Sequence, residues 1–456
     1  MIRRTLLEWQ SLPHGPGEGE IDPGLADRLA SVARASPLGG PGGGRILAHG
    51  RHALGARGMV GVIAADGCAL EILPKIDGLG DGADAASRGR IRERLIHMLA
   101  VAHDLPLDIG RITPLGWQSE TLLEILIGLF ARQLAEAVRR GLPRLYVGQE
   151  EDLPALRGRL DATRQFTTLA ASPERLACRY DALSRDIALN RIIKAAVVKL
   201  ARLSRSAANQ RLLRDLAFAY ADVADVPASA LRFDTVVPDR SNARWRGVLG
   251  LARLLLGDRF QTTSAGALPG HALLFEMATL FEDYVARTLA RALAPDGLGV
   301  VRQGGRKFCL TELDEEDGEG AGRFQTIPDI LVKRGEETLM VIDTKWKRLS
   351  PRIDDPKQGV AQADVYQMIA YGRLYGCREL MLLYPWHGGL GEGHAPRRYA
   401  VSGSEDRLSI ATIDIAEGGE LAGRLARLVR DRIGERTGLD PAARPGSRYA
   451  RRDSRC

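Results

Sequence analysis

The sequence lacks the residue spacings of the common metal and disulfide sites. Its five cysteines include no C-x-x-C pair, and its eight histidines show no H-E-x-x-H or H-x-x-x-H spacing. These absences argue against a zinc knuckle, an iron–sulfur cluster and a disulfide framework. No Gly-Lys dipeptide occurs, so the chain has no P-loop for phosphate binding. We therefore expect that this chain binds no nucleotide itself.

Long apolar runs are also missing. No stretch approaches the roughly 18–20 uncharged apolar residues that a membrane span requires. The first residues, Met1 to Thr5, hold no apolar signal core. We expect a cytoplasmic protein without a membrane partner.

The composition is otherwise that of an ordinary globular protein. With 456 residues, 45% hydrophobic and 27% charged, the chain is long enough for two or three domains with their own cores. The net charge of +7 fits a nucleic-acid partner, although a GC-rich genome alone also produces an Arg-, Ala- and Gly-rich chain. Five of the eight lysines lie between residues 307 and 357. This clustering indicates a place where an ammonium is preferred to a guanidinium.

For residues 1–265 the sequence predicts a β-rich segment followed by helices. This region contains no catalytic pattern. Short apolar runs broken by Gly predict a β-meander or partial barrel within residues 45–76, with a hairpin turn at 65–67. Apolar residues at three- and four-residue spacing predict a helical region over 90–257. The expected helices are 91–103, 120–140, 186–205, 209–223 and 243–257, with an extended stretch at 144–168 and glycine-rich loops at 39–44 and 77–89.

Residues 266–430 predict a second domain, and residues 431–456, rich in Arg, Pro, Gly and Ser, predict a basic disordered tail. The order of elements is αβββαβ with additions, so we expect an α/β (α+β) chain. The expected elements are a helix at 272–293, a strand at 300–310, an acidic loop at 312–322, strands at 324–333 and 338–346 joined by a turn at 334–337, a helix at 362–375, and strands at 379–384, 397–402 and 408–415.

The candidate catalytic residues lie in the expected strands at 324–333 and 338–346, which the turn at 334–337 joins. Pro328-Asp329 is followed, after thirteen residues, by Asp343-Thr344-Lys345. Side chains alternate along a strand, so Asp343 and Lys345 share one face. The hairpin returns Asp329 to the side of Asp343, and two carboxylates and an ammonium converge on an apolar bed. Burying these charges without a partner is costly, and a divalent cation with hard oxygen ligands, such as Mg²⁺, offsets that cost. The alternative is a surface hairpin that ends in a salt bridge.

Two further positions add polar groups. Glu282 lies within the apolar stripe of the helix at 272–293, where a carboxylate calls for a partner, unless it reaches solvent at the edge of the stripe. On the helix at 362–375, Gln367 and Tyr371 are four residues apart and share a face. Gln367 can orient a phosphate, a base or a ligand carboxylate, or it can belong to a half-exposed polar stripe.

These motifs resemble those of known nucleases. The pair Asp329 and Asp343-x-Lys345 in a β-β-β-α-β order resembles the PD-(D/E)XK nuclease superfamily, and Gln367-x-x-x-Tyr371 resembles the Q-x-x-x-Y motif of its RecB-like branch. More closely, the chain is similar to the McrC family, the nuclease subunits of McrBC modification-dependent restriction systems. The segments that carry this similarity are 70–76, 156–158, 190–196, 281–285, 343–347 and 364–368.

The resemblance implies a function, a metal and a partner. Residues 266–430 would form a PD-(D/E)XK core with an Mg²⁺ (or Mn²⁺) bound by Asp329, Asp343, Glu282 and the backbone carbonyl of Thr344. Lys345 and Gln367 would complete the catalytic set. Residues 1–265 would dock on a ring of a McrB-like AAA+ GTPase (or ATPase) and stimulate it. Two copies of this chain would form a homodimer that bridges two such rings. The substrate would be double-stranded DNA that carries 5-methylcytosine.

Two other interpretations stay open at this point. The large first region without chemistry of its own also fits an activating subunit of an NTPase whose nuclease site is vestigial, although all three core residues are present. A stand-alone RecB-like repair nuclease is disfavoured because the first region resembles no helicase.

Overall fold

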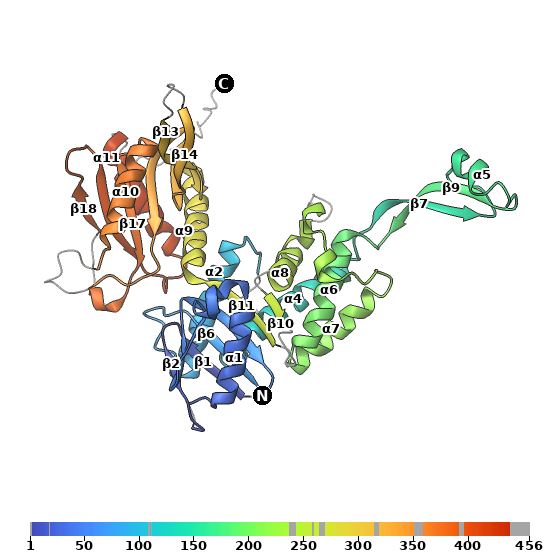
Figure 1. Cartoon of the computed structure of the whole chain (residues 1–456), viewed down its shortest axis with the longest axis horizontal. Coiled ribbons are helices and arrows are strands. Elements are labelled where there is room, and N and C mark those ends of the chain that lie inside the picture. Colours follow the sequence, from blue (N-terminus) through green and yellow to red (C-terminus); the bar gives the residue numbers. More distant parts are fainter. Residues whose placement is uncertain are drawn as a thin grey trace, which may run out of the picture. The chain divides into compact units, whose positions relative to one another are not determined.

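The structure is a computed structural model that describes residues 2–17, 19–107, 110, 112–236, 243–257, 260–263, 270–313, 319–350, 359–391 and 396–437. These residues form the mixed α/β fold that the sequence predicts (Figure 1). The chain divides into two compact units. The first unit consists of Met1–Leu73 and Asp84–Phe275, and the second of Pro74–Ala83 and Glu276–Cys456. The predicted boundary at residues 265 and 266 lies before the observed one between Phe275 and Glu276, and the sequence does not predict that the segment 74–83 joins the second unit.

The first unit contains two β-sheets, a group of helices and a β-arm. Its helices are α1 (Pro23–Ala35), α2 (Ala85–Ala102), α3 (Pro114–Ser119), α4 (Leu122–Arg139), α5 (Ala162–Thr167), α6 (Ala188–Leu203), α7 (Ala207–Ala219) and α8 (Arg246–Leu256). Its strands are β1 (Ile2–Leu7), β2 (Ser11–Pro13), β3 (Leu47–His49), β4 (Ala53–Ala56), β5 (Met59–Ala65), β6 (Cys68–Leu73), β7 (Leu145–Leu153), β8 (Arg159–Leu160), β9 (Leu176–Ser184), β10 (Phe260–Thr263) and β11 (Gly270–Glu276).

The main sheet of this unit is not the β-meander that the sequence suggested. Its order is β1-β6-β5-β11-β10, with β1 parallel to β6. The predicted hairpin between β5 and β6 is confirmed, with Gly67 at a φ of 79°. The neighbouring strand β11 comes from far along the chain and approaches β5 at Gly61, where a Cβ atom would lie 1.9 Å from the carbonyl oxygen of Leu273. Only a glycine permits this close approach.

The predicted helices of the first unit are confirmed as α2, α4, α6, α7 and α8. A three-stranded β-arm, β7-β9-β8 with α5 at its end, projects from these helices (Figure 1). The extended stretch expected at 144–168 is therefore correct for β7 and β8 and wrong for α5, where Asp161 caps a short helix by accepting from the backbone N of Arg164. The loop expected at 39–44 contains two short 3-10 turns, and α2 begins at Ala85, inside the loop expected at 77–89.

The second unit is a six-stranded sheet between helices, with a separate hairpin. Its helices are α9 (Met277–Leu293), α10 (Gln362–Tyr375) and α11 (Leu421–Thr437). Its strands are β12 (Gly299–Arg302), β13 (Lys307–Leu313), β14 (Glu319–Thr326), β15 (Ile330–Arg334), β16 (Glu337–Thr344), β17 (Glu379–Pro385), β18 (Arg397–Ala400) and β19 (Arg407–Ile413).

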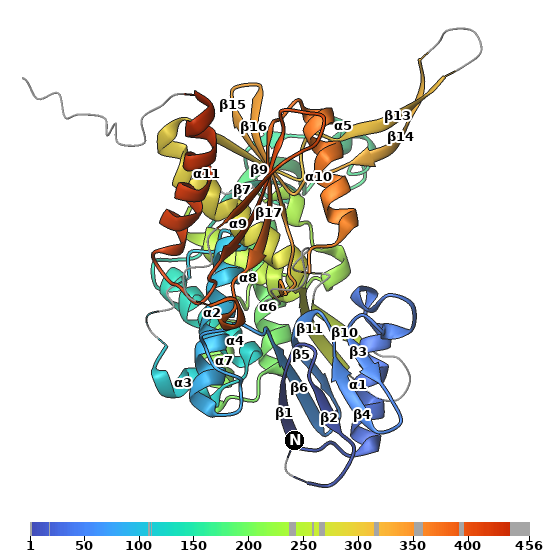
Figure 2. The ribbon, with the colours of Figure 1, turned by 90° about the vertical axis from the view of Figure 1, so that its left-hand side faces the viewer.

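The sheet of the second unit has the order β12-β15-β16-β17-β19-β18. The strands β12, β15 and β16 are antiparallel neighbours, and β16, β17 and β19 run parallel. Helices α9 and α11 cover one face, and α10 covers the other (Figure 2). The core under α10 includes Val341, Met368 and Leu382, so alternate residues of β16 face this helix.

Several expected elements of this unit are wrong in part. The strand expected at 300–310 is two strands, β12 and β13, and the acidic loop expected at 312–322 includes the start of β14. Residues 270–276 form β11 and not the start of a helix, because their apolar side chains are buried in the sheet of the first unit. The single strand expected at 324–333 is two strands, β14 and β15, separated by the segment that holds Pro328. Residues 431–437 continue α11, and the rest of the expected tail lies outside the described residues. In the part of the chain that the structure describes, no helix has the length and apolar character needed to cross a membrane.

Candidate active site

The hairpin of β15 and β16 places two carboxylates side by side. Ile330 pairs with Ile342, and one step further Asp329 lies across from Asp343. Both lie on the face of the sheet that α10 covers, because they alternate with residues that face α9 and α11. Asp343 is 1% exposed, in a strand whose last six residues are all buried.

Asp329 is fixed by the residue that follows Asp343. Its Oδ2 atom accepts hydrogen bonds from the backbone N of Thr344 at 2.8 Å and from the hydroxyl of Thr344 at 2.9 Å. Thr344 therefore approaches Asp329 through its amide and hydroxyl groups. The expected use of its carbonyl oxygen as a metal ligand stays a prediction.

Lys345 connects the carboxylates to α10. Its Nζ atom lies 2.7 Å from Asp343 Oδ2 and donates to Gln367 Oε1 at 3.4 Å. The amide of Gln367 is oriented in turn, because its Nε2 atom donates to the hydroxyl of Tyr371 at 2.7 Å. The structure thus brings together Asp329, Asp343 and Lys345, as the hairpin predicts, and it adds Gln367 through its contact with Lys345.

Glu282 comes to the site from α9. It is 8% exposed, and its Oε1 atom is buried without a hydrogen-bond partner among the described residues. Glu282 thus carries a carboxylate from α9 into the protein interior. Packing of the ring of Phe281 against that of Trp346, with centroids 5.3 Å apart, holds this part of α9 at the end of β16.

The carboxylates of the site disfavour each other's ionised forms. Burial, and then the charge of Asp329, raises the pKa of Glu282 to about 7. Burial also raises the pKa of Asp343, with Asp329 as the second cause, and burial raises the pKa of Asp329. Burial lowers the pKa of Lys345. The hydrogen bond and the charge of Asp343, together with the charges of Asp364 and Asp329, outweigh burial, so the pKa is raised and the ammonium stays charged. Asp329, Asp343 and Glu282 therefore place three carboxyl groups near one another, and Lys345 contacts one of them.

This donor set suits a hard divalent cation. Within the described ranges, no three His, Cys, Asp or Glu side chains are already gathered at metal-binding distances. Mg²⁺ needs only one or two carboxylates, because it retains several of its waters. Asp329 and Asp343 supply these carboxylates, and the unpartnered oxygen of Glu282 adds a third acidic group nearby. The residues present therefore fit the metal that the sequence motif implies.

Two charged residues have roles that sequence reasoning did not assign. Asp364, in the first turn of α10, lies 3.7 Å from Lys345 Nζ through Oδ1 and 2.5 Å from Lys347 Nζ through Oδ2. Its position three residues before Gln367, on the same helix face, was the available signal. Asp283, next to Glu282 on α9, is 5% exposed and pairs with Arg302.

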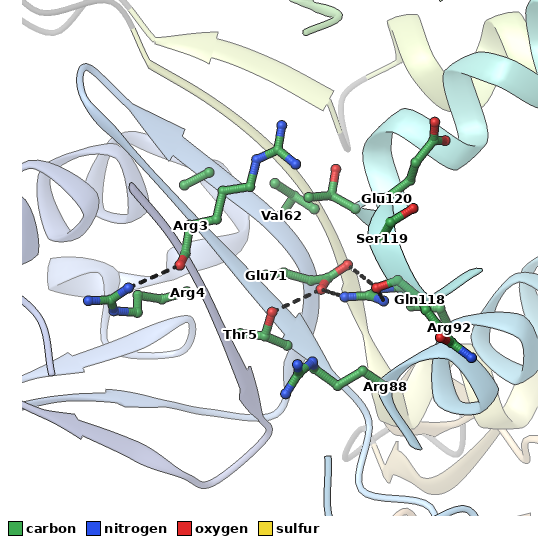
Figure 3. A pocket seen from close by; sticks show the side chains of 12 residues that line it. Arg3, Arg4, Thr5, Val62, Glu71, Arg88, Arg92, Gln118, Ser119 and Glu120 are labelled. Carbon is green, nitrogen blue, oxygen red and sulfur yellow. Dashed lines mark hydrogen bonds and ion pairs between the residues drawn. The ribbon is translucent and has the colours of Figure 1, made fainter. Parts of the chain in front are cut away.

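A separate hollow of about 290 Å³ lies in the first unit (Figure 3). The buried carboxylate of Glu71 forms its floor and accepts hydrogen bonds from Arg92 at 2.7 and 3.0 Å, from the backbone N of Leu122 at 2.8 Å and from the hydroxyl of Thr5 at 3.2 Å. Glu71 thereby connects β1, β6, α2 and the start of α4. Its full set of partners indicates a structural role for this part of the segment 70–76.

Comparison with known proteins supports the mixed α/β fold. A comparison with curated proteins finds no match. A chain in a structure described as a refined half-complex from the tetradecameric assembly of Thermococcus gammatolerans McrB AAA+ hexamers with bound McrC is 21% identical, with a TM-score of 0.66, over 95% of this chain and 100% of that one. A chain of the Thermococcus gammatolerans McrBC complex is 24% identical, with a TM-score of 0.51, over 64% of this chain and 88% of that one.

At these identities the structural likeness establishes a shared fold. The family model described as McrBC 5-methylcytosine restriction system component matches residues 54–385. This match spans more than half of the chain, and it includes both the Glu71 segment and the candidate active site. The chain therefore belongs to the family of McrBC 5-methylcytosine restriction system components.

Proposed function

We propose that this chain is the nuclease subunit of an McrBC-like, 5-methylcytosine-directed restriction complex. In this function it hydrolyses phosphodiester bonds of double-stranded DNA with Mg²⁺, or Mn²⁺, as the cofactor. The observation that carries the proposal is the convergence of Asp329, Asp343 and Lys345 at the ends of two paired strands. A chain that served only to activate a partner would have no need of this arrangement.

In the proposed reaction, Asp329, Asp343, Glu282 and the carbonyl of Thr344 hold the cation. When bound, the metal supplies polarisation of the phosphate and a lowered pKa of the attacking water. Lys345 places its ammonium beside the same carboxylates, where it can donate to a phosphate oxygen as negative charge develops. Gln367, whose amide is oriented by Tyr371, keeps the ammonium in this position.

The order of the second unit supports the assignment to a PD-(D/E)XK nuclease core. Helix α9 precedes β12, β15 and β16, helix α10 follows, and β17 then joins β16 in parallel. The hairpin of β13 and β14 is an insertion in this αβββαβ order. Asp329 directly precedes β15 and Asp343 lies on β16, and these two positions support the assignment.

We further propose that the first unit docks on a ring of a McrB-like AAA+ GTPase, or ATPase, and stimulates it. The β-arm supports this part, because large apolar side chains on its surface have no core to cover them. Those that are at least 40% exposed are Leu145, Tyr146, Leu156, Leu160, Phe166 and Leu183. The similar Thermococcus gammatolerans assembly, in which McrC is bound to McrB hexamers, agrees with such a partner, and its tetradecameric size agrees with two copies of this chain that bridge two rings.

The test is to purify the chain with its AAA+ partner and to assay Mg²⁺-dependent cleavage of methylated and unmethylated plasmid. We expect Asp343→Ala to abolish cleavage while partner binding and NTPase stimulation stay at the level of the unmodified chain. The matched control is Asp406→Asn, which removes a carboxylate next to Arg407 at the far end of β17. Cleavage by the Asp343→Ala complex at the control's rate would falsify the nuclease assignment and leave an activating subunit as the function.

A further inference from the structure

Lys345 contacts a carboxylate that the proposed function assigns to the metal. Its Nζ atom lies 2.7 Å from Asp343 Oδ2, and Asp343 is 1% exposed. A divalent cation bound to Asp343 would bring a second positive charge to the same buried carboxylate. Like charges repel strongly where water screens them poorly. The ammonium must therefore find another acceptor, or it weakens cation binding.

Asp364 offers this other acceptor. Its Oδ1 atom is 3.7 Å from Lys345 Nζ, so a small rotation of the lysine side chain is enough to form a close ion pair. The side chain of Asp364 is 14% exposed and lies in the first turn of α10. Gln367, one turn later on the same face, already accepts from Lys345 and remains within reach.

Lys347 fixes the orientation of the Asp364 carboxylate. Its Nζ atom lies 2.5 Å from Asp364 Oδ2, the oxygen that does not face Lys345. One oxygen of Asp364 is thus paired with Lys347, while the other lies 3.7 Å from Lys345 Nζ. Because two ammonium groups already surround it, Asp364 suits the role of lysine acceptor better than that of metal ligand.

We propose that Asp364 is a positioning residue that takes over the Lys345 ammonium from Asp343 when a divalent cation binds. The proposal rests on the proposed nuclease function, because it requires a cation at Asp343. Without the cation, Lys345 neutralises Asp343. With the cation, Asp364 and Gln367 hold Lys345 beside the site, so that the lysine no longer competes for the carboxylate.

Mn²⁺ binding to the full chain, measured by isothermal titration calorimetry, tests this exchange through a double-mutant cycle. Lys345→Met removes the competitor and should tighten Mn²⁺ binding. Asp364→Asn should weaken binding about fivefold or more when Lys345 is present, and by less than about twofold in the Lys345→Met background. Asp364→Glu, which keeps the carboxylate, should restore most of the affinity, and Asp406→Asn should bind Mn²⁺ like the unmodified chain.

The other outcomes separate the possible failures. Equal weakening by Asp364→Asn in both backgrounds would overturn the exchange, because Asp364 would then act on the cation directly. Unchanged affinity of Asp364→Asn in the presence of Lys345 would overturn it as well. If the unmodified chain and Asp343→Ala bind Mn²⁺ equally, the metal site of the proposed function fails, and the exchange fails with it.

Discussion

Asp329 and Thr344 are joined by two hydrogen bonds to a single oxygen atom, although they are 15 residues apart in the sequence. Both donors belong to Thr344, whose strand neighbours are the acidic Asp343 and the basic Lys345. The position of the Asp329 carboxylate is therefore set by the same short segment that presents the other two groups. Its geometry depends on the backbone amide and the hydroxyl of one residue at the end of β16.

This relationship predicts that Asp329→Asn separates function from stability. The amide oxygen of asparagine can still accept from Thr344, and a buried charge with a raised pKa is removed. We expect Mn²⁺ affinity to fall by more than the roughly 10- to 100-fold that loss of an outer-shell partner costs, with cleavage lost. The thermal midpoint without divalent cations should stay equal or rise. A clear drop in that midpoint would show that the Asp329 charge stabilises the fold.

Tyr371→Phe should impair cleavage without changing metal affinity. The variant loses the hydroxyl that accepts from Gln367, so the amide that faces Lys345 can turn over. We expect kcat to fall about 5- to 10-fold, which corresponds to roughly 1 kcal/mol, and Mn²⁺ binding to stay constant. Tyr399→Phe, at an exposed tyrosine of β18, is the control. Equal activity of both variants would remove Tyr371 from the positioning of Gln367.

Glu71→Gln should destabilise the first unit. The change breaks a buried ion pair and leaves Arg92 charged at 4% exposure, which typically costs about 3–5 kcal/mol. The midpoint of urea unfolding, followed by circular dichroism, should fall accordingly. Glu136→Gln removes an exposed partner of Arg140 at 4.0 Å and should shift the free energy of unfolding by about 0.5 kcal/mol at most. Equal midpoints for the two variants would refute a structural role for Glu71.

His271 predicts a loss of stability in mild acid. Burial, followed by the charges of Arg205 and Lys199, lowers the pKa of this histidine to about 4 in the folded chain, against about 6.5 when unfolded. Between these values the unfolded chain binds a proton that the folded chain does not. The free energy of unfolding should therefore decrease as the pH falls from about 6.5 to about 4, by up to about 3 kcal/mol.

The measurement is urea unfolding at pH 7 and at pH 4.5. His271→Asn should lose less stability between these two pH values than the unmodified chain. His52→Asn, at an exposed histidine, should keep the original pH dependence. If the His271 and His52 variants lose the same amount of stability, another group is responsible for the acid sensitivity.

The local parts of the active site were predictable from the sequence. Helix α10 has the predicted bounds, because Gly376 in the left-handed region, with a φ of 61°, ends it sharply. The period-two alternation around Asp343 predicted that Asp343 and Lys345 share a face, and the 2.7 Å ion pair between their side chains agrees with this. These features depend on near neighbours in the sequence, which a single chain displays.

The parts that were missed depend on distant pairing. Residues 270–276 contain Leu273, Leu274 and Phe275, which fit a helix as well as a strand, and their neighbour β5 lies some two hundred residues earlier. Strand β1 was not expected, because its place beside β6 depends on a parallel pairing that leaves no local pattern. Asp364 as an acceptor for Lys345 was missed for the same reason, because the contact joins a strand end to a helix across a loop.

Residues Pro74–Ala83 belong to the second unit although both flanking segments belong to the first. During synthesis, this short segment leaves the ribosome long before Glu276 and the strands that complete its unit. Asp77 pairs with Arg348, which is translated much later, so this ion pair forms only after that part of the chain has been made. A fragment that begins at Glu276 would never acquire this pairing, so cutting the gene at that codon does not yield an intact second unit.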